Sequence, residues 1–278
     1  MGHFSTTVAP VDDAPTEILQ SLSPLHATLP LFIYGWILRI QGQLSAAIPC
    51  LEAVVELAKS TGQPTIAGMA YHQLAIAARM KGEEAASHEL NDQSLAINQA
   101  LPGAAAELAS MWPRISSAFL ALQHNHLDEA ERRLQRVADL LGDQDLYRSY
   151  RNSAQIGLGL VALARGDLAI AQTELESALA DPINLYPYIY VQGLLGLAAI
   201  AVQQGNQLLC RQMLQRALAY AGQRSLLEEY LEAIFAIADL QPDAALVHEL
   251  LTTILAYVEP LGLTPAIQRL QVVLSSHP

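Results

Sequence analysis

Apolar residues recur at intervals of three and four positions along most of the chain, and Gly, Pro or Asn interrupts them at regular points. This spacing gathers apolar side chains on one face of a helix, so it predicts a series of antiparallel helix pairs. First helices of the pairs are expected at about 29–40, 64–80, 111–123, 149–164, 187–203 and 226–240. Second helices are expected at about 45–61, 83–100, 127–141, 167–180, 207–222 and 243–258, followed by a short helix at 265–274.

A short phrase repeats at the turn between the two helices of each pair. The turn residue is followed by a small or apolar residue two positions later and by another five positions later. The turn residues are Gly42, Gly82, Asn125, Gly166, Gly205 and, weakly, Pro242. Self-similarity at a fixed period of about 40 residues indicates a solenoid, in which each unit buries its apolar face against its neighbours.

The unbroken period predicts one array rather than several globular domains. Residues 1–15 are expected to form a disordered lead-in, 16–263 the helical array, and 264–278 a capping helix and tail. Breaks at the ends of second helices are expected at Gly62, Leu101–Gly103, Gly142–Asp143 and Asp181–Pro182. Pro113 poses a local conflict: a start near Trp112 puts it in a tolerated first turn, whereas a start near Ala104 puts it inside the helix. The sequence favours the start near Trp112.

Two further positions repeat within the units. Seven residues before the turn there is a small residue, at Gly35, Ala75, Ala118, Gly159 and Ala198. Nine residues after the turn there is usually a leucine, at Leu51, Leu134, Leu175, Leu214 and Leu251. This pattern resembles the tetratricopeptide repeat, whose consensus has a small residue, a Gly-Asp turn, an Ala and a large apolar residue at these offsets. The segment Arg165–Ala171 is the best match.

The units are longer than the classical tetratricopeptide repeat of about 34 residues. Longer units resemble the helical-repeat sensor regions of large bacterial ATP-dependent regulators of the maltose-activator and LuxR-like type. The resemblance covers residues 29–258 and implies an all-α, right-handed superhelical solenoid of about six helix pairs. Neither a phosphate-binding loop nor a basic helix-turn-helix is found, so the resemblance implies a sensor region alone or a stand-alone adaptor.

Composition and charge limit the classes of partner that the chain is expected to bind. Hydrophobic residues make up 52% of the chain and charged residues 15%, so apolar surface beyond an ordinary core is expected. Either the concave surface is apolar, or a neighbouring domain or a second copy of the chain, as in a homodimer, packs against it. The formal net charge of −12 disfavours nucleic acid and acidic membranes, because both are bound through Lys and Arg. No signal-peptide pattern and no apolar run of membrane-spanning length is found, so a cytoplasmic protein is expected.

Residues that often carry chemistry have simple structural interpretations in this sequence. Cys50 and Cys210 lie four repeats apart, so they are predicted to be unpaired and buried. His124 and His126 lie in a turn with no third ligand nearby, so no metal site is expected. No nucleophile, acid and base form a known motif, so the sequence predicts no catalytic residue, no cofactor and no enzyme activity.

The candidate ligand-binding residues are polar and aromatic positions on the first helices, which line the concave groove of such arrays. They are Trp36, Arg39, His72, Gln73, Arg79, Trp112, Phe119, Arg148, Arg151, Tyr188 and Gln192. Aromatic and arginine side chains combine contact area with directed hydrogen bonds. Because guanidinium groups pair with carboxylates, an acidic partner is predicted. The alternatives are packing between helices for the tryptophans and a solvated surface role for the arginines.

Two functions fit this architecture. The first is a scaffold that binds a peptide or protein partner in its groove, in bacterial transcriptional regulation or signalling. The alternative is a small-molecule sensor that encloses an apolar ligand, for which the low charge content would reflect a lined cavity. A ligand retained through purification would separate the two.

Overall fold

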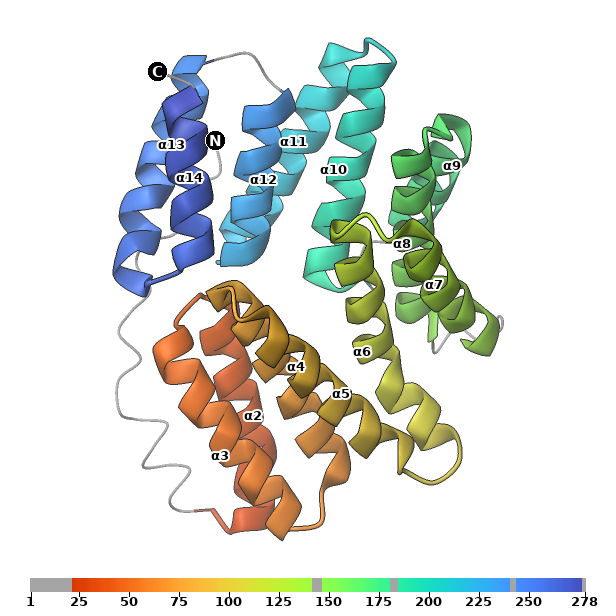
Figure 1. Cartoon of the computed structure of the whole chain (residues 1–278), viewed down its shortest axis with the longest axis vertical. Helices are drawn as coiled ribbons and strands as arrows, with labels where there is room; N and C mark the ends of the chain where they lie inside the picture. The colour runs from red at the N-terminus through yellow and green to blue at the C-terminus, as the bar shows by residue number, and fades with distance from the viewer. Residues whose placement is uncertain (1–21, 142–146, 181–184, 241–243, 277–278) are drawn as a thin grey trace. The chain divides into compact units, whose positions relative to one another are not determined.

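The computed structural model describes residues 22–141, 147–180, 185–240 and 244–276, and in these ranges the chain forms helices and no strands (Figure 1). The helices of the first half are α2 (Pro24–Ile40), α3 (Leu44–Ser60), α4 (Pro64–Lys81), α5 (Glu84–Gln99), α6 (Ala104–Gln123) and α7 (Leu127–Leu141). Those of the second half are α8 (Arg148–Arg165), α9 (Leu168–Leu179), α10 (Pro187–Gln203), α11 (Gln207–Gln223), α12 (Leu227–Leu240), α13 (Ala244–Val258), the 3-10 turn η3 (Glu259–Leu261) and α14 (Thr264–Ser276).

Consecutive helices pack against each other as the sequence predicts. The contacting pairs include α2 with α3, α4 with α5, α8 with α9 and α10 with α11. First helices of neighbouring pairs also touch, as α2 does α4 and α8 does α10. The prediction of an all-α repeat of helix pairs is therefore confirmed.

The helices group into two compact units. One comprises the described residues of 111–250, and the other comprises 22–110 together with 251–276. We call these the central unit and the terminal unit. Each has its own buried core: Leu134, Ile156 and Leu175 are fully buried in the central unit, and Leu38 and Leu51 in the terminal unit.

The predicted turn residues share one backbone conformation. Gly42, Gly82, Gly166 and Gly205 have positive φ angles, and Asn125 has a φ of 58°. At Gly166 this left-handed conformation ends α8, and the N–H of Asp167 then donates to the carbonyl of Ala162 at 2.9 Å. Only Gly and, less readily, Asn adopt this conformation without strain, which explains why these residue types recur at the turn.

The small residue and the leucine of the repeat pack against each other. A Cβ added to Gly35 would lie 3.0 Å from Leu51, and one added to Gly159 would lie 3.0 Å from Leu175. The leucine of a second helix therefore fills the space above the small residue of its own first helix. Leu175 also reaches Gly196 of the following first helix, where an added Cβ would lie 2.9 Å away. These contacts join helices within and between pairs.

The expected start of the third first helix is wrong. α6 begins at Ala104, so Pro113 lies inside it. A proline has no N–H, so the carbonyl of Ala109, four residues earlier, lacks its helical donor. The side-chain amide of Asn98 in α5 replaces that donor, with Nδ2 lying 2.9 Å from the Ala109 oxygen. This bond from a neighbouring helix makes the interior proline tolerable.

The first helix of the array also starts earlier than expected. α2 begins at Pro24 rather than near Leu29, and Pro24 occupies the first turn, where proline is favoured. Pro30 consequently lies inside the helix. Expectations for the lead-in 1–15, the breaks at Gly142–Asp143 and Asp181–Pro182, and the turn at Pro242 concern residues outside the described ranges.

The two cysteines form no disulfide. Cys210 is buried, as predicted, whereas Cys50 is only half-buried and its thiol donates to the carbonyl of Leu31 at 3.4 Å. Burial raises the pKa of Cys50 to about 11, so this thiol is protonated and weakly nucleophilic at neutral pH.

Candidate functional site

Aromatic side chains from three first helices meet in the central unit. The ring of Trp112 in α6 lies 5.0 Å from that of Tyr150 in α8 and 4.9 Å from that of Tyr186, the residue that precedes α10. All three side chains are half-buried, so each packs on its neighbours and still reaches solvent. Tilted rings at these distances contribute a favourable free energy in addition to that from the apolar area they bury.

A second ring contact extends this group along α6 and α10. Phe119 meets Tyr188 edge to face at 5.8 Å, and Gln123 Nε2 donates to the Tyr188 hydroxyl at 3.2 Å. Gln192 lies one turn after Tyr188 on α10 and is half-buried. We call Trp112, Phe119, Tyr150, Tyr186 and Tyr188 the aromatic face.

Two predicted arginines begin α8 beside this face. Arg148 and Arg151 are both half-buried, and three positions apart they lie on the same side of the helix; Tyr150 stands between them in the sequence. Burial raises the pKa of the Tyr150 hydroxyl, so this group is a neutral hydrogen-bonding partner at physiological pH. The aromatic face thus combines apolar rings with hydroxyl groups, and two arginines flank Tyr150 in the sequence at the start of α8.

The terminal unit carries a different group of predicted residues. His72 in α4 is buried, and burial lowers its pKa to about 4, so the ring is neutral at physiological pH. A side-chain hydrogen bond with Asn91 opposes this effect of burial, while the positive charges of Arg39 and Arg79 lower the pKa further. Arg39 is itself only 2% exposed. This group is therefore a buried polar cluster and not an open surface.

Some polar atoms in this part of the terminal unit have no hydrogen-bond partner within the described chain. They are Nε1 of Trp36, Nδ1 of His72 and Oε1 of Gln73. The Trp36 ring stacks on Phe32 with centroids 6.4 Å apart. Buried polar atoms without partners are costly.

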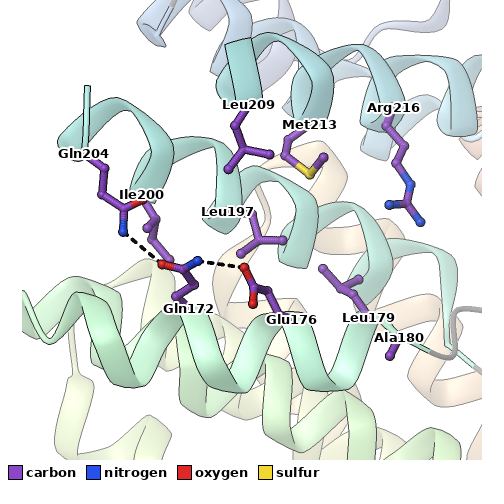
Figure 2. A pocket seen from close by; sticks show the side chains of 10 residues that line it. All are labelled: Gln172, Glu176, Leu179, Ala180, Leu197, Ile200, Gln204, Leu209, Met213 and Arg216. Atoms are coloured by element: carbon purple, nitrogen blue, oxygen red, sulfur yellow. Dashed lines mark hydrogen bonds between the residues drawn. The ribbon is translucent and has the colours of Figure 1, made fainter. Parts of the chain in front are cut away.

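An open cleft lies between α9, α10 and α11 (Figure 2). It has a volume of about 240 Å³ and is walled mainly by Leu179, Leu197, Ile200, Leu209 and Met213. Its polar edge is a chain of hydrogen bonds: Gln204 donates to Gln172 at 2.9 Å, and Gln172 donates to Glu176 at 2.8 Å. The cleft can accommodate an apolar side chain beside a polar group.

Arg216 stands at the other side of this cleft, and its guanidinium group lies 5.5 Å from the centre of the Tyr190 ring. Tyr190 in turn contacts Tyr220 at 4.4 Å, and Arg224 lies 4.0 Å above the Tyr220 ring. The four side chains form a row of cation–ring and ring–ring contacts on α10, α11 and the residue that follows α11. A guanidinium group over an aromatic ring is attracted by the electrons of the ring face.

The structure brings the predicted residues together as two groups. Trp112, Phe119 and Tyr188 share the aromatic face, and Arg39, His72 and Arg79 share the polar cluster of the terminal unit. Sequence reasoning missed Tyr150, although it stands between Arg148 and Arg151 at the start of a first helix. It also missed Arg216, because this residue lies on a second helix, whereas the candidates lie on first helices.

The described residues form neither a metal site nor a membrane-spanning helix. Within those ranges, no group of three or more His, Cys, Asp or Glu gathers closely enough to hold a metal ion. The rings of His124 and His126 are 6.2 Å apart. No helix in the described part of the chain is long and apolar enough to cross a membrane.

The fold defines a helical-repeat protein of the tetratricopeptide-like class. A crystal structure of a Rap protein complexed with Competence and Sporulation Factor is similar to it, with a TM-score of 0.60 over 96% of this chain and 79% of the other. The two sequences are 16% identical, so the likeness concerns the fold. No protein-family model and no curated protein matches the chain.

Proposed function

We propose that this chain is a non-enzymatic scaffold that binds a peptide or an extended protein segment across the aromatic face, in bacterial regulation or signalling. The observation that carries the proposal is the contact of half-buried rings from α6, α8 and α10, with Trp112 at its centre. Rigid aromatic anchors of this kind dominate the energetics of recognition surfaces. That the similar Rap structure holds Competence and Sporulation Factor supports a binding role for this arrangement of helices.

An acidic partner fits the arginines beside the face. Arg148 and Arg151 lie on one side of the α8 start, where a carboxylate would also meet the positive end of the helix dipole. A guanidinium group binds a carboxylate through two parallel hydrogen bonds. The expected ligand therefore has an apolar or aromatic side chain next to Asp, Glu or a free C-terminus. Cytoplasmic location and a homodimer remain part of the proposal.

The test starts from a random-peptide display library, with the full chain as bait. Enriched peptides are synthesised with a fluorophore, and their affinities are measured by fluorescence anisotropy. Trp112→Ala and Tyr188→Ala should each weaken binding at least about tenfold, which corresponds to roughly 1.4 kcal/mol. Leu208→Ala, an exposed position on α11, is the matched control and should leave the affinity unchanged.

Two outcomes would contradict the proposal: a library that yields no common sequence, or enriched peptides that bind Trp112→Ala as tightly as the unmodified chain. The arginines give a finer test. The double variant Arg148→Ala, Arg151→Ala should lower the affinity for acidic peptides more than the affinity for their amidated or Asn- and Gln-substituted forms. If the affinities of both peptide forms fall equally, the arginines support the fold and do not bind a carboxylate of the peptide.

A small-molecule sensor is the second candidate, and the cleft between α9, α10 and α11 is the observation that favours it. Its walls are mainly apolar, but its volume of about 240 Å³ is smaller than the roughly 300–1,000 Å³ of common ligand pockets, so it would hold only a small apolar ligand. Native mass spectrometry of the protein purified from its source would detect a retained ligand. Such a ligand, lost on Leu197→Trp, would favour this second function.

A further inference from the structure

The cleft between α9, α10 and α11 carries two opposite charges on an otherwise apolar wall. Of the described residues that line it, Arg216 is the basic one and Glu176 is the acidic one. Figure 2 shows Glu176 on α9 and Arg216 on α11, with α10 passing between these two helices. Leu197 and Ile200 of α10 supply apolar surface between them. The cleft therefore offers a cation, an anion and an apolar floor to one ligand.

An aromatic ring holds Arg216 at its side of the cleft. Its guanidinium group lies 5.5 Å from the centre of the Tyr190 ring. Tyr190 is buried and packs on Tyr220, with ring centroids 4.4 Å apart. The attraction between cation and ring limits the positions of the Arg216 side chain. No carboxylate of the described residues pairs with Arg216, so a ligand carboxylate would be its ion-pair partner.

A relay of two amides holds Glu176. Gln204 Nε2 donates to Gln172 Oε1 at 2.9 Å, and Gln172 Nε2 donates to Glu176 Oε1 at 2.8 Å. The relay fixes one oxygen of the carboxylate, and the second oxygen has capacity to accept from a ligand. No cation of the described residues pairs with Glu176. A ligand ammonium group would therefore complete its hydrogen bonding.

Charge and size together select the ligand. A neutral apolar molecule would use neither Arg216 nor Glu176. A simple carboxylic acid would pair with Arg216 but would be repelled by Glu176, and a simple amine would do the reverse. A zwitterion pairs with both. The volume of about 240 Å³ lies below the roughly 300–1,000 Å³ of pockets for drug-sized ligands, which suits a molecule the size of one amino acid.

We propose that this cleft binds a free apolar α-amino acid as the zwitterion. The carboxylate pairs with Arg216, the ammonium group pairs with Glu176, and the aliphatic side chain packs on Leu197, Ile200 and Met213. This inference rests on the second candidate function, a small-molecule sensor, and names its ligand class. It is separate from peptide binding at the aromatic face, which other residues form.

The first test is isothermal titration calorimetry of the full chain with L-leucine, L-isoleucine and L-methionine. Each should give saturable binding. Leucine amide lacks the carboxylate, and the keto acid of leucine lacks the ammonium group. Each analogue should bind at least about tenfold more weakly than L-leucine, because each loses one charge-assisted contact. Glycine, which has no side chain to bury, should not bind.

Two variants assign the charges to the two residues. Arg216→Gln and Glu176→Gln should each lower the affinity for L-leucine at least about tenfold. Arg216→Gln should leave the affinity for leucine amide nearly unchanged, and Glu176→Gln should leave or raise the affinity for the keto acid. A merely structural role for these residues would not produce this crossed pattern.

Controls lie on the same helices outside the cleft. Arg211→Gln on α11 and Glu174→Gln on α9 remove the same charges at positions that do not line it. Both should bind L-leucine as the unmodified chain does. Leu197→Trp fills the apolar floor and should abolish binding of every amino acid. Circular dichroism confirms that each variant is folded.

Three results would overturn the inference. The three amino acids could give no saturable binding at millimolar concentrations, the amide or the keto acid could bind as tightly as L-leucine, or both charge variants could bind L-leucine as the unmodified chain does. A neutral ligand retained in native mass spectrometry and lost on Leu197→Trp would overturn it while leaving the sensor function standing. With neither a retained ligand nor amino-acid binding, the sensor function would fail as well.

Discussion

The helix pairs α4/α5 and α8/α9 have the same antiparallel form but are joined by different chemistry. In α9 the buried positions are Ala171, Leu175, Ala178 and Leu179, all of them apolar. In α5 they are Ser87, Ser94 and Asn98, all of them polar. The comparison shows that the two helices of a pair lie close together in both units. Either apolar or polar side chains can fill the space between them.

Polar packing in α4/α5 works because both buried serines of α5 bond the backbone of α4, while the amide nitrogen of Asn98 bonds the Ala109 carbonyl of α6. Ser94 Oγ donates to the carbonyl of Gly68 at 2.7 Å, and Ser87 Oγ donates to that of Ala75 at 2.8 Å. Gly68 has no side chain, and an added Cβ would lie 2.2 Å from Oδ1 of Asn98. The glycine therefore makes room for the amide, as Gly159 makes room for Leu175.

The apolar pair should be the more sensitive to truncation. Leu175→Ala removes a fully buried side chain that fills the space over Gly159 and Gly196. We expect a loss of about 4 kcal/mol in the free energy of unfolding, from lost burial and the cavity that remains. Urea unfolding followed by circular dichroism measures it. Ile170→Ala, in the same helix but 57% exposed, should change stability little, and an equal loss there would contradict this account.

The polar pair should make stability depend on pH through His72. Its pKa in the folded chain is about 4, below the ordinary value of 6.5, mainly because burial disfavours the charged ring. The unfolded chain therefore takes up a proton first as the pH falls. The contribution of neutral His72 to the free energy of unfolding is complete above pH 6.5 and is lost as the pH approaches 4. The pKa difference corresponds to at most about 3 kcal/mol.

The measurement is a set of urea unfolding curves between pH 8 and pH 4 for the unmodified chain and His72→Gln. Other titrating groups contribute equally to both proteins, so the difference isolates His72. The unmodified chain should lose more stability than the variant in this interval. His88→Gln, at an exposed position of α5, is the control and should follow the unmodified chain. Parallel curves for His72→Gln and the unmodified chain would remove the basis for this prediction.

Sequence periodicity predicts the helix pairs compared here, but it does not predict the polar contacts within α4/α5. The turn residues and the small residue and leucine of the repeat predict helix pairs, because each pattern reports a local backbone or contact requirement. The second unit lacks the leucine, since Asn91 stands at its place. The sequence therefore signals that α4/α5 is unusual. It does not show which polar partners replace the apolar contact, because those lie on other helices.

Pro113 illustrates the same limit. Local rules favour a helix start beside a proline, and the sequence accordingly predicts a start near Trp112. α6 continues through Pro113 because Asn98, from the preceding helix, bonds the carbonyl that the proline leaves without a donor. Similarly, first-helix register predicts which residues are candidates for ligand contact, but not that Arg39 is buried while Trp112 is half-exposed at a ring cluster.

This coupling can be tested with a double-mutant cycle. Asn98→Ala leaves the Ala109 carbonyl without a donor and should cost about 2 kcal/mol in the free energy of unfolding. Pro113→Ala restores the backbone N–H, so Asn98→Ala should then cost about 1 kcal/mol less. Urea unfolding of the two single variants, the double variant and the unmodified chain gives the interaction free energy. Strictly additive effects would show that Asn98 does not compensate for the proline.

Surface charges should matter least. Arg165, at the end of α8, bonds Asp128 at 2.7 Å and Glu131 at 2.8 Å, both on α7. The carboxylates of Glu131 and Asp128 raise the pKa of Arg165, but these groups are exposed and salt screens them. Arg165→Ala should therefore leave the urea midpoint within experimental error of the unmodified chain at physiological salt.

Arg133→Ala, which removes the exposed pair with Glu129, provides a matched comparison. A loss as large as that of Asn98→Ala, persisting at high salt, would mean that this ion pair helps to hold the α7 and α8 contact, and that hydrogen bonding and burial alone do not account for the packing between pairs.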